Sequence, residues 1–236
     1  MEASLGSGAM TNDIPSIQHS DLIFIIGSDT TAAHPIIASH IKQALRAGKA
    51  RLVVADPKHV EIADHASLYV AHRPGTDVML LNGIMQQIIK NGWQDEAYIA
   101  ERVTGFDVLK DEVMREDYSP ANVELITGVK PADLLQMAEM IGTAERTAVY
   151  YSMGITQHTT GHDNVRSIAN LQMLCGNIGI EGGGINRCVV SQTYRVRVTW
   201  VHCRKTSRVT RKSVTQRHTR SLPKRGIVRN CLQKMA

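Results

Sequence analysis

The chain has 236 residues, enough for one large domain or two small ones, and 43% of them are hydrophobic, an ordinary share for a globular protein. Its net charge of +5 averages two unlike parts: residues 187–236 hold 14 of the 27 Lys and Arg and no Asp or Glu, whereas residues 1–186 carry a net charge of −9. The sequence excludes a membrane span, and its start lacks a secretory signal. The four cysteines have no CxxC spacing, so the sequence supports neither a disulfide framework nor a zinc site, and we expect a cytoplasmic protein.

The first part of the chain alternates short apolar runs with amphipathic segments. The runs predict buried strands, and the segments between them have the spacing of helices. Strands are predicted at 21–27, 51–55 and 67–71, and helices at 30–48 and from 76 to about 89. This order is typical of a parallel, doubly wound sheet.

The middle of the chain predicts an added helical segment at 92–143, with Pro120 and Pro131 near helix starts. A strand at 147–154, a helix at 163–174 and a glycine-rich loop at 176–186 follow. We therefore predict an α/β fold for residues 1–186, with a doubly wound, mostly parallel Rossmann-like sheet. The basic tail, 187–236, has no convincing apolar face and is predicted to be irregular or disordered.

Small and polar residues follow three of the predicted strands, in the strings IIGSDTTAAHP, VADPKH and SMGITQHTTGHDN. The carboxyl ends of parallel strands open onto the crevice where such sheets bind ligands, and small residues let backbone amides approach a phosphate. Asp56 follows the second strand, where Rossmann-like proteins hold a ribose hydroxyl. The fingerprint GxGxxG is missing, because Gly27 is followed by SDTTAA, and this argues against a plain NAD dehydrogenase.

For two other features, a histidine pair and a cysteine, we prefer a structural role over a functional one. His158 and His162 are four residues apart, a spacing that could bind a metal on a helix, but the segment QHTTGH is rich in Thr and Gly and predicts a polar loop. Cys175 lies in the apolar run LQMLC and is interpreted as a core thiol.

An ordered series of strings resembles the alpha subunit of molybdenum- or tungsten-dependent formate dehydrogenases, in the dimethyl sulfoxide reductase superfamily. The strings cover roughly residues 5–186 and are GSGAMTNDIP, IGSDTTAAHP, VADP, RPGTDVMLLNG, NGW, YIAERVTGF, ITGV, YSMGITQHTTGHDNV and LCGNIGIEGGGIN. The series, rather than any single motif, carries the resemblance. It implies an oxidoreductase that converts formate to carbon dioxide.

The resemblance also implies a cofactor, molybdopterin guanine dinucleotide with Mo or W, and fifteen residues that would bind it. Those expected to cradle the phosphates and the pterin are Gly27, Ser28, Asp29, Thr30, Thr31, His34 and Pro35. Asp56 and Pro57 would lie at its guanosine end, where Gly75 and Asp77 would contact the guanine nucleotide. Those expected near the metal are Met153, Gly154, Gln157 and His158.

Two departures from the family pattern limit what is expected of this chain. Asp29 stands where the family commonly has Asn, and a carboxylate is mildly unfavourable beside a phosphate. The family's cysteines for a [4Fe-4S] cluster, and the Cys or selenocysteine that ligates the metal, would precede the region seen here. We therefore expect a fragment of the catalytic subunit, with no catalytic residue or metal ligand of its own, that is inactive without the remainder of the subunit and the electron-transfer subunits.

Two alternative functions remain open. The tail, with its charge of +14, could bind nucleic acid non-specifically through phosphate contacts, although we expect no specific nucleic-acid partner. The Rossmann-like pattern could also belong to an NAD(P)-binding protein.

The tail itself suggests a shifted reading frame. Codons can be chosen for RCVVSQTYRVRVTWVHC so that dropping two nucleotides yields VCRQSNVQGACDMGALP, which resembles the family's continuation after Gly-Ile-Asn. Although the choice of synonymous codons helps the agreement, the first two positions of each codon constrain it. We hypothesise that one nucleotide is missing after the codon for Asn186, from the gene or from its sequence.

The coding DNA around Asn186 tests this hypothesis directly. We expect the shifted frame to encode the family-like peptide over the first part of the tail. A shifted frame that holds no such peptide would disprove the frameshift.

Overall fold

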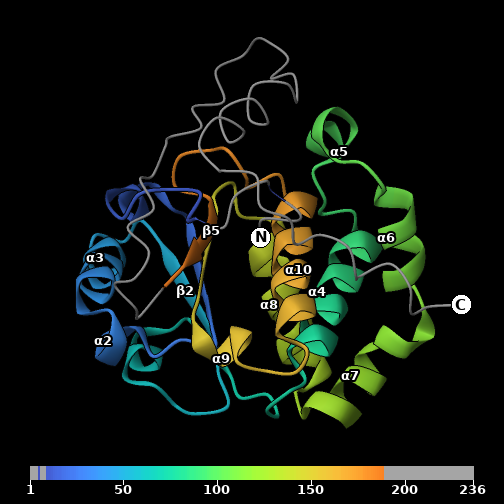
Figure 1. The fold of residues 1–236 in the computed structure, drawn as a ribbon, viewed down its shortest axis with the longest axis horizontal. Helices are drawn as coiled ribbons and strands as arrows, with labels where there is room; N and C mark the ends of the chain where they lie inside the picture. The colour runs from blue at the N-terminus through green and yellow to red at the C-terminus, as the bar shows by residue number, and fades with distance from the viewer. Residues whose placement is uncertain (1–4, 6–8, 189–236) are drawn as a thin grey trace, which may run out of the picture. The chain divides into compact units, whose positions relative to one another are not determined.

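The computed structural model describes residue 5 and residues 9–188, and it has a five-stranded parallel sheet in this part of the chain (Figure 1). The strand order is β3-β2-β1-β4-β5, and every neighbouring pair is parallel. This is the order of a Rossmann-like sheet, and it confirms the predicted α/β fold class. The strands are β1 (Leu22–Ile26), β2 (Arg51–Ala55), β3 (Leu68–Val70), β4 (Thr147–Tyr151) and β5 (Gly184–Arg187).

Helices cover both faces of the sheet, because successive side chains of a strand point to opposite faces. Ile23 and Ile25 of β1 pack with α3 (Pro35–Arg46) and the short helices η1 (Pro15–His19) and η2 (Glu61–His65). Leu22, Phe24 and Ile26 point to the other face, toward α4 (Asp77–Asn91), α8 (Pro131–Gly142) and α10 (Gly161–Leu174). Figure 1 shows α3 on one side of the strands and α4, α8 and α10 on the other.

The added helical segment packs around α4, which contacts α6, α7 and α8. Its remaining elements are α5 (Glu96–Arg102), α6 (Phe106–Val113), η3 (Glu116–Tyr118) and α7 (Pro120–Thr127). Pro120 and Pro131 occupy the first helical positions of α7 and α8, as predicted, since the missing N–H of proline would have no partner there. Within the described ranges, no helix is long and apolar enough to cross a membrane.

The prediction of a single helix at 30–48 is wrong, because the structure has two helices there, α2 (Thr30–Ala33) and α3. His34 adopts φ −139° and ψ 61° between them. The ring of a proline clashes with an α-helical residue before it, so Pro35 moves His34 out of the helix and begins the next one. The break brings the side chain of His34 into the loop region after β1.

The glycine-rich stretch predicted as a loop contains a fifth strand, β5, paired with β4. Its sequence, Gly-Ile-Asn-Arg, has few of the residues that favour strands, so the pairing with β4 forms it. The strand passes Asn186 and includes Arg187, and Cys188 is buried behind it. The rest of the basic tail, 189–236, lies outside the described residues, and so do the expectations of disorder, of a shifted frame and of nucleic-acid binding.

Candidate cofactor-binding site

The loops that follow β1, β2, β3 and β4 lie at the same edge of the sheet, because these strands run in one direction. Backbone hydrogen bonds join neighbouring loops: the N–H of Gly27 donates to the carbonyl of Ala55 at 3.2 Å, and the N–H of Asp56 donates to the carbonyl of Val70 at 3.2 Å. The sheet grows in opposite directions from β1, so the point between β1 and β4 is the topological switch point where such sheets bind ligands. Every predicted site residue follows one of these four strands.

Gly27 and Gly154 bring the loops after β1 and β4 into direct backbone contact. The N–H of Gly154 donates to the carbonyl of Gly27 at 3.1 Å. A Cβ on Gly154 would lie 2.6 Å from that carbonyl oxygen, and one on Gly27, whose φ is +55°, would lie 2.9 Å from the carbonyl carbon of Gly154. Both positions therefore require glycine, which lets the two loops pack backbone to backbone at the switch point.

The loop after β1 presents polar side-chain atoms that are buried and have no hydrogen-bond partner among the described residues. They are the hydroxyl oxygens of Ser28 and Thr31 and both ring nitrogens of His34. Thr30 is already satisfied, since its hydroxyl donates to the carbonyl of Ser28 at 3.4 Å. Buried polar groups are nearly always hydrogen-bonded in native proteins, so these atoms point to a polar ligand. Pro35 follows them as an exposed residue.

Asp29 is held by its own loop and by Lys58 from the loop after β2. Its carboxylate accepts a hydrogen bond from the N–H of Ala32 at 3.2 Å and caps α2. Nζ of Lys58 lies 3.8 Å from the second carboxylate oxygen of Asp29. This pair is largely exposed, so it adds little to stability, but it balances the negative charge of Asp29 locally.

Asp56 follows β2 and is half-buried. One carboxylate oxygen accepts a hydrogen bond from the N–H of Lys58 at 2.9 Å, across Pro57, and its backbone carbonyl accepts one from the hydroxyl of Tyr69 at 3.0 Å. Burial raises the pKa of Asp56 above its ordinary value of 3.8, and the nearby charge of Asp29 adds to the increase. The hydrogen bond from Lys58 and the charge of His72 oppose that increase in pKa.

His72 and Asp77 form a buried pair at the end of β3. Nε2 of His72 lies 3.0 Å from Oδ1 of Asp77, and the two side chains are 1% and 4% exposed. The other polar atom of each, Nδ1 of His72 and Oδ2 of Asp77, is buried without a partner in the described chain. Gly75, at φ +80°, makes the turn between them. The hydroxyl of Thr76, the residue before α4, donates to the carbonyl of Arg73 at 2.6 Å and does not cap the helix.

The loop after β4 contains the short helix α9 (Met153–Thr156) and presents a sulfur and an imidazole. Met153 is 44% exposed, and the amide of Gln157 donates to its sulfur at 3.3 Å. Nε2 of His158 lies 2.7 Å from the carbonyl oxygen of Gly154. Asn164, which is buried, donates to the carbonyl of Ile155 at 3.0 Å and fixes the loop against α10.

The described residues contain no group of three or more His, Cys, Asp or Glu that could hold a metal ion. His158 lies in the loop before α10 and His162 in its first turn, so the two do not share a helix face. Burial raises the pKa of the Cys175 and Cys188 thiols to about 12, so both remain protonated near neutral pH. A thiol rather than a thiolate is a poor metal ligand.

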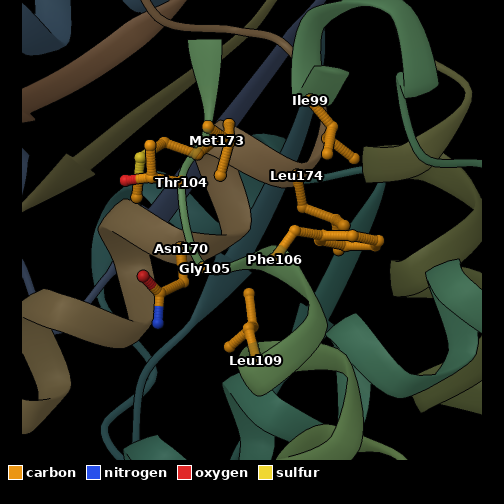
Figure 2. Close-up of a pocket in the computed structure, with 9 residues that line it drawn as sticks. Ile99, Thr104, Gly105, Phe106, Leu109, Asn170, Met173 and Leu174 are labelled. Carbon is orange, nitrogen blue, oxygen red and sulfur yellow. The ribbon is translucent and has the colours of Figure 1, made fainter. Parts of the chain in front are cut away.

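A small cavity of about 60 Å³ lies away from these loops, between the α5–α6 connection and the last turns of α10 (Figure 2). Figure 1 shows α5 at the opposite end of α10 from α9. The cavity wall is mostly apolar and holds no predicted site residue: its lining residues are Ile99, Val103, Thr104, Gly105, Phe106, Leu109, Asn170, Met173 and Leu174. The side chains of Phe106 and Leu109 face it in Figure 2.

Sequence reasoning missed three residues that shape the site: Lys58, His72 and Asn164. Lys58 and His72 each follow a predicted strand within three residues, so their position alone was a usable signal. Asn164 gave no such signal, because only the packing of α10 beneath α9 brings it to the carbonyl of Ile155.

Comparison with known proteins now identifies the family. The profile of the molybdopterin oxidoreductases matches residues 2–226, which is most of the chain. The chain belongs to the molybdopterin oxidoreductase family. Membership of this family implies a molybdopterin cofactor with Mo or W.

Individual relatives confirm the resemblance drawn from the sequence strings. The chain is 42% identical, over 183 residues, to F420-dependent formate dehydrogenase 1 subunit alpha of Methanococcus maripaludis, covering 78% of this chain and 27% of the relative. It is 38% identical, over 186 residues, to formate dehydrogenase H of Escherichia coli, and this match covers 79% of this chain and 26% of the relative. A nitrate reductase of Symbiobacterium thermophilum is 38% identical over 185 residues, and this match covers 75% of this chain and 24% of the relative. The chain thus spans about a quarter of the length of the curated relatives it matches.

The fold agrees with that of a solved structure. Acetylene hydratase from Pelobacter acetylenicus matches 72% of this chain and 25% of its own, with a TM-score of 0.64 and 21% sequence identity. This likeness supports the α/β fold.

The raised pKa of Asp56 predicts that its charge destabilises the folded chain. As the pH rises from the ordinary value of 3.8 through the raised pKa, the folded state binds more protons than the unfolded state, so stability is lost. Asn at this position can still accept the hydrogen bond from Lys58. We expect Asp56→Asn to raise the unfolding midpoint at neutral pH by about 1–3 °C, a modest change because the side chain is partly in water.

Thermal unfolding followed by circular dichroism at two pH values measures this effect. The gain should vanish at about pH 3, where the carboxyl is protonated in both states. Asp107→Asn, which neutralises an exposed carboxylate on α6, is the matched control and should change the midpoint less. A midpoint for Asp56→Asn that falls at neutral pH would contradict the prediction.

Proposed function

We propose that this chain binds molybdopterin guanine dinucleotide along the carboxyl edge of its sheet, as the cofactor-binding segment of a formate dehydrogenase catalytic subunit. The observation that carries the proposal is a set of buried polar atoms at both ends of this edge, on Ser28, Thr31 and His34 and on Asp77, that have no partner in the described part of the chain. The family supplies the cofactor class, and these atoms are donors and acceptors suited to it. The residues present therefore fit the group.

At the phosphate end, the chain offers hydroxyls and an imidazole rather than a cluster of cations. Gly27 and Gly154 join the two loops that would face the phosphates, and their own N–H groups donate to the carbonyls of Ala55 and Gly27. Ser28 and Thr31 would donate from their hydroxyls, and His34 from a ring nitrogen. Lys58 offsets the carboxylate of Asp29, which would otherwise repel a phosphate.

At the base end, Asp77 has the chemistry that recognises guanine. Guanine presents two neighbouring donors, N1–H and the 2-amino group, and a carboxylate presents two acceptor oxygens at matching spacing. Asp56 is the second carboxylate of this end and would accept from a ribose hydroxyl, with Pro57 and Gly75 shaping the turns around it. Met153, Gln157 and His158 would line the opposite, metal-proximal end.

The reaction that we propose for the complete enzyme is the oxidation of formate to carbon dioxide. The bound cofactor would accept the two electrons, and this chain would position it and exclude water. The formate dehydrogenases among the relatives favour this substrate, although the nitrate reductase shows that similar sequences serve other substrates. The remainder of the subunit, a [4Fe-4S] cluster and electron-transfer subunits are the partners we propose.

The lengths of the pairwise matches are in keeping with a division near residue 186. The relatives named above align over 183–186 residues, the length of the chain before the basic tail. The family profile extends further, to residue 226. We propose 1–186 as the cofactor-binding domain and 187–236 as a separate tail.

Nucleotide binding tests the proposed function with the full 236-residue chain. We expect calorimetry to show that GDP binds at least about tenfold more tightly than ADP or NAD, because adenine lacks the paired donors that a carboxylate recognises. Equal affinities, or preferred binding of NAD, would contradict the proposal, and the latter would favour an NAD(P)-binding protein.

Replacing Asp77 should exchange the preferred base. An amide offers one donor and one acceptor, which match the C2 carbonyl and N1–H of xanthine, so Asp77→Asn should weaken GDP binding by about tenfold or more and strengthen binding of xanthosine diphosphate. Asp111→Asn, an exposed carboxylate on α6, is the control and should leave both affinities unchanged. Unchanged GDP binding in Asp77→Asn would remove Asp77 from the site.

We also propose that this chain is inactive by itself, because it spans only about a quarter of the length of the formate dehydrogenases that it matches. The expected result is no reduction of a viologen dye by formate with the purified chain and added cofactor. Formate-dependent dye reduction above the rate without protein would overturn this part of the proposal.

A further inference from the structure

The turn that carries His72 and Asp77 is fixed from outside. The N–H of Arg73 donates to the carbonyl of Thr127 at 2.8 Å, and its guanidinium donates to the carbonyls of Leu125 and Ile126 at the end of α7, at 2.7 and 3.2 Å. The hydroxyl of Thr76 closes the turn on the carbonyl of Arg73. The turn therefore has little freedom, and the two buried side chains face each other across it.

In this pair, one oxygen of the Asp77 carboxylate contacts His72, and the other makes no hydrogen bond within the described residues. Oδ1 is 3.0 Å from Nε2 of His72, whereas Oδ2 is buried and without a partner in the described chain. An isolated carboxylate can rotate about its χ2 bond, whose energy profile is broad. The contact with His72 removes this rotation and sets the plane of both oxygens before any ligand binds.

We infer that His72 is a positioning residue for base selection: it orients the Asp77 carboxylate so that both oxygens accept from a guanine, through N1–H and the 2-amino group. This inference rests on the proposed binding of a guanine nucleotide and adds a residue that the sequence strings did not single out. Oδ1 retains a lone pair beside its contact with His72, so it can serve both partners.

Without His72, Asp77 would lose the contact that sets the orientation of its carboxylate. The 2-amino group of guanine is the donor that this change affects most, because its bond requires the full two-oxygen arrangement.

The test compares GDP with inosine diphosphate, whose base lacks the 2-amino group, on the full chain. The wild type should prefer GDP by about tenfold, the contribution of one hydrogen bond to a charged group. His72→Leu should reduce this ratio to within about threefold, and His72→Gln, whose Nε2 can reach the same carboxylate oxygen, should restore most of it. Circular dichroism confirms that each variant is folded at the temperature of the titration.

Each outcome decides between the alternatives. A purely structural role for His72 would lower the affinities for both nucleotides by the same factor, and an unchanged ratio in His72→Leu overturns the inference. If His72→Leu does not fold, His72→Asn, whose amide is too short to reach Asp77, takes its place and should show the same loss of ratio. A wild type that binds neither nucleotide overturns the proposed function and this inference with it, whereas a wild type that prefers GDP while the variants keep the ratio overturns the inference alone.

Discussion

The contact between the backbones of Gly27 and Gly154 is the constraint on which the candidate site depends. The carbonyl of one loop accepts from the N–H of the other at 3.1 Å, and neither position has room for a Cβ. This contact joins the loops after β1 and β4 at the point where the sheet changes its direction of growth. The buried polar groups of Ser28, Thr31 and His34 follow Gly27 in the same loop.

The candidate site contains buried polar groups whose missing hydrogen bonds a ligand could supply. Ser28, Thr31 and His34 bury polar atoms that have no partner among the described residues, and Asp56 carries a carboxylate whose pKa is raised by burial. Each of these features lowers the stability of the chain when no ligand is bound. Such an arrangement is expected where a protein has been shaped to bind a polar group tightly, since binding restores the missing hydrogen bonds.

Much of the fold could be predicted because its elements are dictated locally. The apolar runs at β1 and β2 and the prolines at the starts of α7 and α8 carry enough information by themselves. The break at His34 was also encoded, in the proline that follows it. Strand β5 could not be predicted from its own residues, because Gly-Ile-Asn-Arg becomes a strand only through pairing with β4. Likewise, the strings indicated Asp77 by family resemblance, whereas its pairing with His72 depends on a turn held by α7.

The two ends of the candidate site are built by different strands. The glycine contact and the hydroxyls come from the loops after β1 and β4, and the carboxylates that suit a ribose and a base come from the loops after β2 and β3. Groups without shared partners contribute nearly independently to a free energy. Under the proposed function, substitutions near β3 could therefore change the choice of base in evolution without disturbing the loops proposed to hold the phosphates.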